Sequence, residues 1–438
     1  MIGVTVAETY AEWALSLRPD DVPIDVRAAA TRHLLDGVGC AIGAVRSAAA
    51  TYADALADGA REATVLGSGS RASVERAALA NGILVHALDF DDTHGKALVH
   101  PTATVLPSAF AAGERAGSSG AEVLAAVVAG YEIVGRLGAA IPHGFHARGF
   151  HATSVCGVFA AALVASKLSG LNAGSTVDAL GIAGSAAAGS LEFLSSGAST
   201  KQLHPGLAAM NGIVAANLAA AGADGPASIF EGEHGLYRSY LGSGVDPAVL
   251  TSGLGERWET TMITIKPYPA CQLSHASLDA LRAAGVPSAD DVATVTFEVP
   301  PEVAEIVCGK PAPRTPYEGK FSLEFSAASL LADGQLTIGS FDPGAMSRPN
   351  VLELASRVGR RERPFDGVPA EAPGVCEVRL RDGTLLRGEV SKSRGGPDAP
   401  LSQEELLGKF RTNGGTDGLA VALLSLDSQP SLSRVMQP

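Results

Sequence analysis

Charged and aromatic side chains are both scarce in this chain. Only 18% of its 438 residues are charged and 5% are aromatic, whereas 46% are hydrophobic and 51 are glycine. This composition is typical of a large globular protein with a well-buried interior. Helices with so few large side chains bury their surface by packing closely on one another, so we expect many closely packed helices.

Cysteine is scarce as well, and its distribution excludes two structural roles. The five cysteines are scattered, odd in number and never spaced as CxxC. This excludes a disulfide framework and a zinc knuckle, and it fits free thiols in a reducing cytosol. No basic residue precedes Arg18 and an acid stands at Glu8, so we expect no signal peptide and a cytoplasmic protein.

Excess positive charge and long apolar runs are also missing. The net charge is −13 and the pI is near 5.3, which argues against nucleic acid or an anionic membrane as a partner. The longest run without a charged residue, 202–223, contains His204, Pro205 and Asn211. We therefore expect a buried helix there and no membrane span. Such an acidic chain can bind an anionic substrate only through a local basic pocket.

Hydrophobic periodicity predicts helices through the first half of the chain and a change near Ile265. Apolar residues recur every three to four positions over 6–16, 25–42, 47–58, 73–86, 102–116, 120–140, 151–168, 175–188 and 206–221. We expect these helices to form one domain of residues 1–262. A last helix over 403–409 predicts that residues 400–438 return to it.

Residues 263–399 have the pattern of a smaller α+β domain, which we expect to be a lid. Alternation predicts strands over 292–299 and 375–380, and Asp382-Gly383 predicts a hairpin turn into 384–390. Helices are expected over 321–332 and 349–358. The fold class expected for the whole chain is therefore mainly α.

The stretch from Asn81 to Pro107 concentrates polar residues in an otherwise apolar sequence. Read as a helix through Thr93, it places three side chains on one face: His86, Asp89 and Thr93. Asp92 would lie on the flank and Asp91 would point elsewhere, with His100 on a following loop. A solvated helix end is the alternative. The surrounding apolar residues favour a buried or cleft position, which is typical of functional carboxylates.

Three histidines lie close together at His143, His146 and His151. Metal ligation is the less favoured interpretation, because Gly144 and Gly149 interrupt the spacing and no cysteine joins them. His151 begins a long apolar helix, where the helix N-terminus would keep its imidazole neutral and able to act as a base.

Two lysines are isolated from other basic residues. Lys201 precedes His204 and Lys266 precedes His275, in stretches rich in Pro, Gly and Ser. Solvated lysines are the simpler interpretation, and a clamp for a small dicarboxylate is the alternative. The DFDD sequence at 89–92 also resembles magnesium-diphosphate motifs of helical folds. We find no convincing second acidic cluster and no glycine-rich phosphate loop to support that function.

Several motifs, in order along nearly the whole chain, resemble the MmgE/PrpD family. They are HALDFDDTH with HPTATVLPSAFAAGE, GFHATSVCGVFAAALVASKLSGL, TKQLHPGLAAMNGIVAANLAAAGADGP with EGEHG, KPYPACQLSH, and KFSLEFSAASLLADG. The family includes 2-methylcitrate dehydratase, cis-aconitate decarboxylase and iminodisuccinate epimerase. The resemblance implies a helical domain with an α+β lid, a homodimer, and catalysis without a metal or organic cofactor.

The resemblance also implies a set of pocket residues, drawn from both domains. The family's polar pocket positions fall on Asp89, Thr93, His100, His151, Lys201 and Lys266. The two lysines are thereby expected to face the substrate. The decarboxylase-like pattern has a histidine where this chain has Cys271 and a tyrosine where it has Phe325. Cys271 followed by His275, and the sequence KFSLE at 320–324, look closer to the epimerase and to uncharacterised members of the family.

We expect a cofactor-independent lyase, a dehydratase or decarboxylase, that acts on a small di- or tricarboxylic acid by proton transfer next to a carboxylate. His151 and His100 are the expected acid/base pair, with Asp89 orienting nearby. Lys201 and Lys266 are expected to stabilise substrate and developing charge. Further substrate contacts are expected from Thr93, Asp92 and His275. Cys271 is either a second proton carrier or a packing residue. An epimerase and a non-catalytic carboxylate-binding protein are the alternatives.

Overall fold

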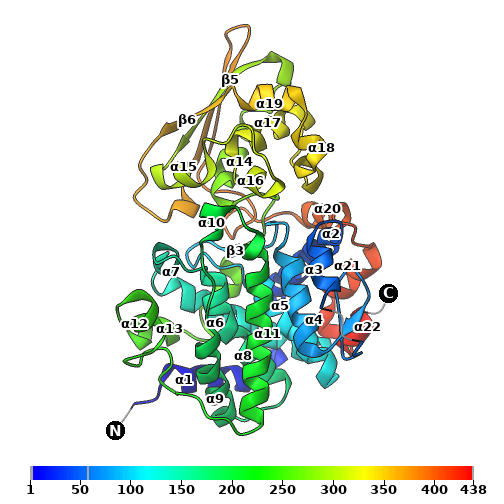
Figure 1. Cartoon of the computed structure of the whole chain (residues 1–438), viewed down its shortest axis with the longest axis vertical. Coiled ribbons are helices and arrows are strands. Elements are labelled where there is room, and N and C mark those ends of the chain that lie inside the picture. The colour runs from blue at the N-terminus through cyan, green and yellow to red at the C-terminus, as the bar shows by residue number, and fades with distance from the viewer. Residues whose placement is uncertain (1–2, 57–58, 437–438) are drawn as a thin grey trace. The chain divides into compact units, whose positions relative to one another are not determined.

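The computed structural model describes residues 3–56 and 59–436, which divide into two compact units (Figure 1). The first, here the helical unit, contains Ala87 and the described residues before it, Asp91–Ile263, and the described residues from Gln403 onward. The second, the mixed unit, contains Leu88–Phe90 and Thr264–Ser402. The chain is mainly α with a small mixed sheet, which confirms the expected fold class.

The helical unit is built from long helices that bury most of their residues. Its main helices are α1 (Val6–Ser16), α2 (Ile24–Ala44), α4 (Val74–His86), α5 (Pro101–Ala116), α6 (Gly120–Ala139), α8 (Ala152–Leu168), α9 (Ala173–Ala183) and α11 (His204–Ala220), with α20 (Gln403–Thr412), α21 (Asp417–Leu424) and α22 (Leu432–Met436) from the end of the chain. Helix α8 lies against α5, α6, α9 and α11. Helix α20 packs on α2.

Most predicted helices of this unit are confirmed within a few residues. Helix α1 has the predicted bounds, and its capping box joins Thr5 and Glu8. The helix predicted over 47–58 is observed as the shorter α3 (Ala49–Asp54). Residues 57–58 of that prediction lie outside the described part of the chain. The helix predicted over 175–188 is α9 followed by a 3₁₀ turn at Gly184–Ala186.

Glycines let two helix pairs approach closely. A Cβ on Gly82 of α4 would lie 2.4 Å from the Cα of Gly206 in α11. A Cβ on Gly157 of α8 would lie 2.5 Å from the Cγ2 of Thr104 in α5. Larger side chains would hold these helices apart. The ends of α4, α5, α8 and α11 are thereby brought together.

The mixed unit is a four-stranded sheet covered by helices. The strand order is β6-β5-β7-β8, with β6 (Val358–Glu362) parallel to β5 (Val292–Val299) and the other pairs antiparallel. Helix α14 (His275–Ala283) packs on β7 (Gly374–Leu380) and β8 (Leu385–Val390). The unit also holds α17 (Leu323–Asp333) and α19 (Pro349–Ala355). The predicted β7–β8 hairpin is confirmed, and its turn has Gly383 at φ +93°.

The end of one helix and the whole course of another segment are predicted wrongly. The helix predicted over 349–358 ends at Ala355, and Val358 begins the edge strand β6, whose other residues are exposed. The helix predicted through Thr93 ends at His86, so His86, Asp89 and Thr93 do not share a helical face. Among the described helices, none is long and apolar enough to cross a lipid bilayer.

Candidate active site

Asp91 joins two histidines from different elements. Its Oδ2 lies 2.8 Å from the Nδ1 of His86, the last residue of α4, and 3.3 Å from the Nδ1 of His100, which precedes α5. All three residues are buried. Burial alone opposes the charge on Asp91, but the two histidines overcome it and hold the pKa of this carboxyl well below its usual range. Asp91 is therefore a buried carboxylate that can only accept hydrogen bonds.

The charge on Asp91 fixes the tautomers of both histidines. Because the carboxylate accepts, the Nδ1 of a neutral His86 carries the proton and its Nε2 has a lone pair. The Nδ1 of His100 also lies 2.9 Å from the carbonyl oxygen of Asp92, a second acceptor, so His100 has the same tautomer. The Nε2 of His86 is buried and has no hydrogen-bond partner among the described residues.

The neighbouring Asp92 is engaged within the helical unit. Its Oδ2 lies 2.9 Å from the Nδ1 of His33, and both of its oxygens accept hydrogen bonds from Thr102. The Thr102 hydroxyl also lies 2.6 Å from the phenol oxygen of Tyr131. The Asp92 side chain is fully buried. Its observed contacts anchor the loop before α5 to α2 and to the first turn of α5.

His151 caps the start of α8 and meets His204 at the start of α11. The two Nδ1 atoms are 3.2 Å apart, so one of them carries a proton and the other accepts it. The ring of His151 is stacked on that of His86, with centroids 5.6 Å apart, and lies 6.3 Å from that of His100. The Thr153 hydroxyl accepts a hydrogen bond from the backbone N–H of His100. This contact links the starts of α5 and α8.

Four histidines in the helical unit have lowered pKa values, so their side chains are neutral at pH 7. Burial lowers the pKa of His86 to about 4 and that of His146 to about 3. Burial also lowers the pKa of His151 well below its usual value, and that of His204. The charge of Lys201, half-buried just before α11, adds to the lowering at all four. His151 is thus neutral, as expected from its sequence position, but mainly because it is buried.

In the mixed unit, Lys266 pairs with Asp89. Its Nζ donates to the Asp89 carbonyl oxygen and to Oδ1, both at 3.0 Å, and both residues are buried. Asp89 has a φ of +51°, in the left-handed region that non-glycine residues seldom adopt. Two hydrogen bonds from one ammonium to this residue stabilise the strained turn.

Cys271 and His275 lie at the start of α14. Cys271 is half-buried and its backbone N–H donates to the carbonyl of Lys320. His275 is completely buried, with its Nε2 3.0 Å from the carbonyl of Ala270, and burial lowers its pKa to about 3. Phe325 lies in the core of the mixed unit, where its ring packs 5.9 Å from that of Phe341.

Comparison with known proteins identifies the family. A model of the MmgE/PrpD N-terminal domain matches residues 8–247, and a model of the MmgE/PrpD C-terminal domain matches residues 268–417. This chain belongs to the MmgE/PrpD family. The family predicted from the ordered motifs is therefore confirmed.

The MmgE/PrpD chain is also similar to curated relatives. It is 30% identical to cis-aconitate decarboxylase of Aspergillus terreus over 443 aligned positions. This alignment covers 94% of this chain and 89% of that protein. It is 33% identical to cis-aconitate decarboxylase of Homo sapiens over 379 aligned positions. This alignment covers 82% of this chain and 76% of that protein. This MmgE/PrpD protein is an enzyme of the lyase class, as predicted.

The spacing of residues in this sequence did not reveal every member of the buried histidine cluster. His86 and Asp91 appear in the polar stretch, but a helix through Thr93 would turn Asp91 away from His86. The contact between His151 and His204 joins residues 53 positions apart. The glycines Gly82 and Gly206 were the available signal, because close helix packing at these positions brings the end of α4 next to the start of α11.

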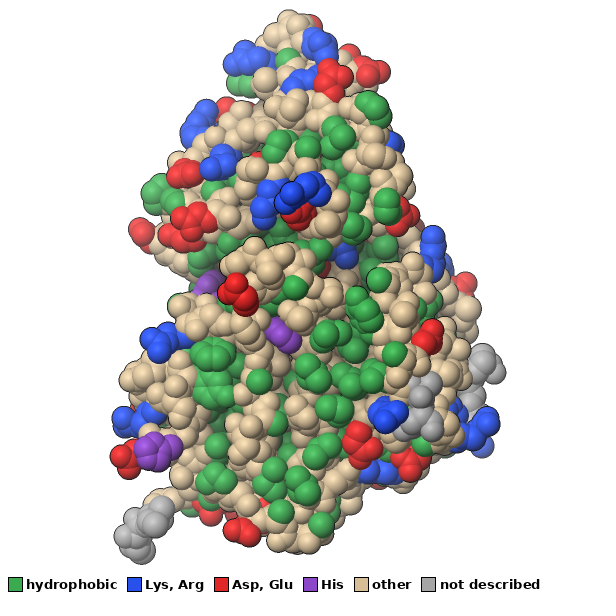
Figure 2. Space-filling view, in the orientation of Figure 1, with side chains coloured by type: hydrophobic (Ala, Val, Ile, Leu, Met, Phe, Trp, Pro, Cys, Tyr) green, Lys and Arg blue, Asp and Glu red, His purple; other side chains and the backbone are tan. Residues whose placement is uncertain are grey.

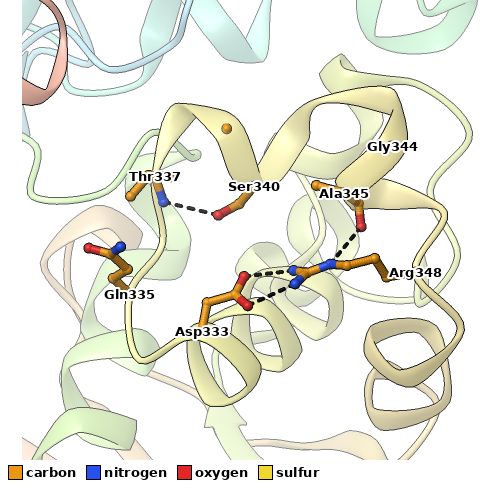
Figure 3. A pocket seen from close by; sticks show the side chains of 8 residues that line it. Asp333, Gln335, Thr337, Ser340, Gly344, Ala345 and Arg348 are labelled. Carbon is orange, nitrogen blue, oxygen red and sulfur yellow. Dashed lines mark hydrogen bonds and ion pairs between the residues drawn. The ribbon is translucent and has the colours of Figure 1, made fainter.

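A separate hollow lies in the mixed unit, with a volume of about 540 Å³ (Figure 3). Its charged groups are paired with each other, since Arg348 donates to both carboxylate oxygens of Asp333 at 2.8 and 2.6 Å. The Nε of Arg348 donates to the carbonyl of Ala345, and the N–H of Thr337 donates to Ser340. These mutual contacts do not form a site for an anionic ligand.

Proposed function

We propose that this enzyme acts in the cytoplasm as a carboxy-lyase on a small polycarboxylic acid, with cis-aconitate as the first candidate, and without a metal or organic cofactor. The observation that carries the proposal is the buried cluster in which Asp91 fixes the tautomers of His86 and His100 beside His151. Relatives named cis-aconitate decarboxylase support the reaction class and substrate.

The proposed proton carriers are His100 and His151. The Nε2 of His100 has a lone pair because its Nδ1 faces two acceptors. Burial is the main reason that the imidazolium form of His151 is disfavoured. A bound polycarboxylate would bring negative charge beside the ring of His151 and raise its pKa. Substrate binding therefore favours protonation of the group that must then deliver the proton.

The proposed chemical step is balanced by one proton. The bond between the substrate carbon and its leaving carboxylate breaks, CO2 departs, and the electron pair stays on the substrate. A histidinium then delivers one proton to the substrate carbon and becomes neutral. The neutral donor then regains a proton from solvent through the second histidine, which returns the site to its starting state. Preorganised charges that stabilise the developing carbanion are usually the largest contribution to such a step.

Lys201 is the proposed charge partner of the substrate in the helical unit. Its ammonium acts on four buried histidines, so it lies near the groups proposed to transfer the proton. Thr93 is the proposed contact for a carboxylate, since its hydroxyl lies 3.4 Å from the Nδ1 of His100. For Asp92 we propose a positioning role, because His33 and Thr102 occupy its carboxylate.

Four residues of the mixed unit are also proposed to contribute to the reaction. Lys266 and Asp89 are proposed to act as a pair. The ammonium of Lys266 either contacts the substrate or stabilises the turn at Asp89. Cys271 is proposed as a proton carrier and His275 as a substrate contact. The full burial of His275 makes a positioning role the alternative for it.

Epimerisation is the second candidate. Cys271 and Phe325 stand where the decarboxylase-like pattern has histidine and tyrosine. Proton removal from one face of a carbon and return to the other face requires two carriers, and a thiol beside the substrate would supply one. Decarboxylation stays the first candidate because the similar proteins that span most of this chain are named as decarboxylases.

A proton NMR screen of di- and tricarboxylates, combined with capture of released CO2, tests the proposal. Cis-aconitate should give a new alkene product and one CO2 for each molecule consumed. A His151→Gln enzyme should form both at a rate lowered roughly 10²–10⁴-fold, while the exposed His234→Gln should behave as the unmodified enzyme. Turnover without CO2 would support dehydration or epimerisation. Loss of turnover after EDTA treatment, restored by magnesium, would contradict cofactor independence.

We also propose a homodimer that pairs through helix α11. Three of its apolar side chains are exposed at spacings of seven and four, which place them on one face: Leu207, Val214 and Leu218. Figure 2 shows hydrophobic side chains gathered over the part of the viewed face where Figure 1 places α11. By analytical ultracentrifugation, Leu218→Glu should give monomers. The control Val421→Glu, at an exposed position of α21, should stay dimeric.

A further inference from the structure

We propose that His86, His100 and His151 form a binding site for a divalent transition-metal ion such as Zn²⁺, Co²⁺ or Ni²⁺, and that the bound ion inhibits the enzyme. Each of the three side chains offers one nitrogen atom, and these atoms all lie within 4.8 Å of one another. All three residues are buried. Imidazole nitrogens suit zinc, cobalt, nickel and copper, whereas magnesium and calcium prefer oxygen.

The contacts of the three rings leave their Nε2 atoms for the metal. The Nδ1 of His86 faces Asp91, and that of His100 faces Asp91 and the Asp92 carbonyl. The Nδ1 of His151 faces His204, so the tautomer in which it donates leaves its Nε2 unprotonated. Ligating histidines in metal sites have the same support, in which the other ring nitrogen donates to a carboxylate or carbonyl.

The buried Nε2 of His86 is independent evidence for a ligand at this place. It is buried, and no described residue is its hydrogen-bond partner. A buried nitrogen with an unused lone pair is costly unless something occupies it. The ring of His86 lies 4.5 Å from that of His100 and 5.6 Å from that of His151, between centroids. A metal ion bound to this nitrogen would lie among the three rings.

The charges beside the cluster act on a bound metal ion in opposite directions. The Asp91 carboxylate supplies negative charge next to two of the ligands. The charge of Lys201 acts in the opposite direction, so we expect Lys201→Met to bind the ion more tightly.

Inhibition rests on the proposed function, because the site uses both proposed proton carriers. A metal ion bound to the Nε2 of His100 and of His151 occupies the lone pairs that would accept a proton. The metal site itself does not depend on the identity of the substrate. Its binding is measured without substrate, so failure of the site and failure of the proposed reaction are distinguishable.

The test is a titration of the full chain, free of any affinity tag, with Co²⁺. Calorimetry should give one ion per chain, and visible absorption should show bound cobalt without a sulfur-to-cobalt band. His86→Asn and His151→Asn should each weaken binding by at least roughly 100-fold, and Asp91→Asn by roughly 10–100-fold, as found for residues that support metal ligands. The controls His234→Asn and Cys271→Ser should bind as the unmodified protein.

Folding of each variant is checked by circular dichroism, and Asp91→Asn serves as the isosteric variant if His86→Asn does not fold. The site is overturned if the unmodified protein binds no Co²⁺, or if Asp91→Asn and His151→Asn bind it unchanged. Zn²⁺ should abolish turnover in the unmodified enzyme, and excess EDTA should restore it. Full turnover with the site occupied by Zn²⁺ would overturn the inhibitory part.

Discussion

Asp91 and His86 form a fully buried carboxylate–imidazole pair, with 2.8 Å between Oδ2 and Nδ1. The pair joins the end of α4 to the loop before α5, and the same oxygen lies 3.3 Å from His100. One carboxylate thus sets the protonated nitrogen of two rings. The arrangement resembles the general design in which a buried acid orients a catalytic base.

Replacement of this carboxylate should affect turnover more than substrate binding. In Asp91→Asn, the amide has the same shape but donates as well as accepts, so His86 loses its fixed tautomer and both His86 and His100 lose the adjacent negative charge. We expect kcat to fall roughly 10²–10⁴-fold, the usual contribution of proton transfer, with KM changed little. Steady-state kinetics check this. An unchanged kcat would show that Asp91 has only a structural role.

His151 and Lys201 should fail differently when replaced. His151→Gln should lower kcat by roughly 10²–10⁴-fold and leave substrate binding nearly intact. Lys201→Met removes a charge from both the ground state and the transition state, so it should weaken binding as well as turnover. Lys201→Met should also reduce any preference of the enzyme for doubly charged over singly charged substrates. Normal binding and turnover in Lys201→Met would make Lys201 an ordinary solvated lysine.

Gly82 should tolerate no side chain. Its Cβ would meet the backbone of Gly206, which has no flexible end to move away, so we expect Gly82→Ala to cost about 1–3 kcal/mol. The control is Gly408→Ala in α20, where nothing lies within 4 Å of the added Cβ. That change should stabilise the protein by about 0.5–1 kcal/mol. Urea denaturation compares the two, and equal effects would contradict the close packing of α4 and α11.

His275 should make the protein sensitive to acid. Its pKa is lowered from 6.5 to about 3 by burial and by Lys266, partly offset by Ala270, Asp279 and Asp89. The unfolded chain binds the proton first, so stability is full above pH 6.5 and is lost as the pH falls toward 3. Relative to His275→Gln, the unmodified protein should lose about 2–3 kcal/mol between pH 6.5 and 4.5. A constant difference between the two across this range would contradict the burial of a neutral His275.

The sequence predicted elements best where local patterns act alone. The alternating residues 292–299 form β5 with the predicted bounds, and Asp382-Gly383 forms the predicted turn. The edge strand β6 was missed because four of its five residues are exposed and it has no alternation of buried side chains. Periodicity finds a strand only when the sheet buries one of its faces.

The candidate site was harder to predict because its geometry depends on distant partners. The positive φ of Asp89 ends any helix there, and the contact that stabilises it comes from Lys266, 177 positions away. Once the helix ends at His86, the direction of Asp91 reverses and it meets His86 and His100. The local pattern in 81–93 holds no sign of this turn.

Turnover of cis-aconitate in deuterium oxide tests the central claim most directly, because proton delivery by a histidine leaves solvent deuterium on carbon. Proton NMR and mass spectrometry should find one deuterium on carbon in each product molecule, with one CO2 released. The His151→Gln enzyme should form product at a rate lowered roughly 10²–10⁴-fold. Product without deuterium on carbon, or full activity in both His151→Gln and His100→Gln, would contradict proton transfer by the histidine cluster.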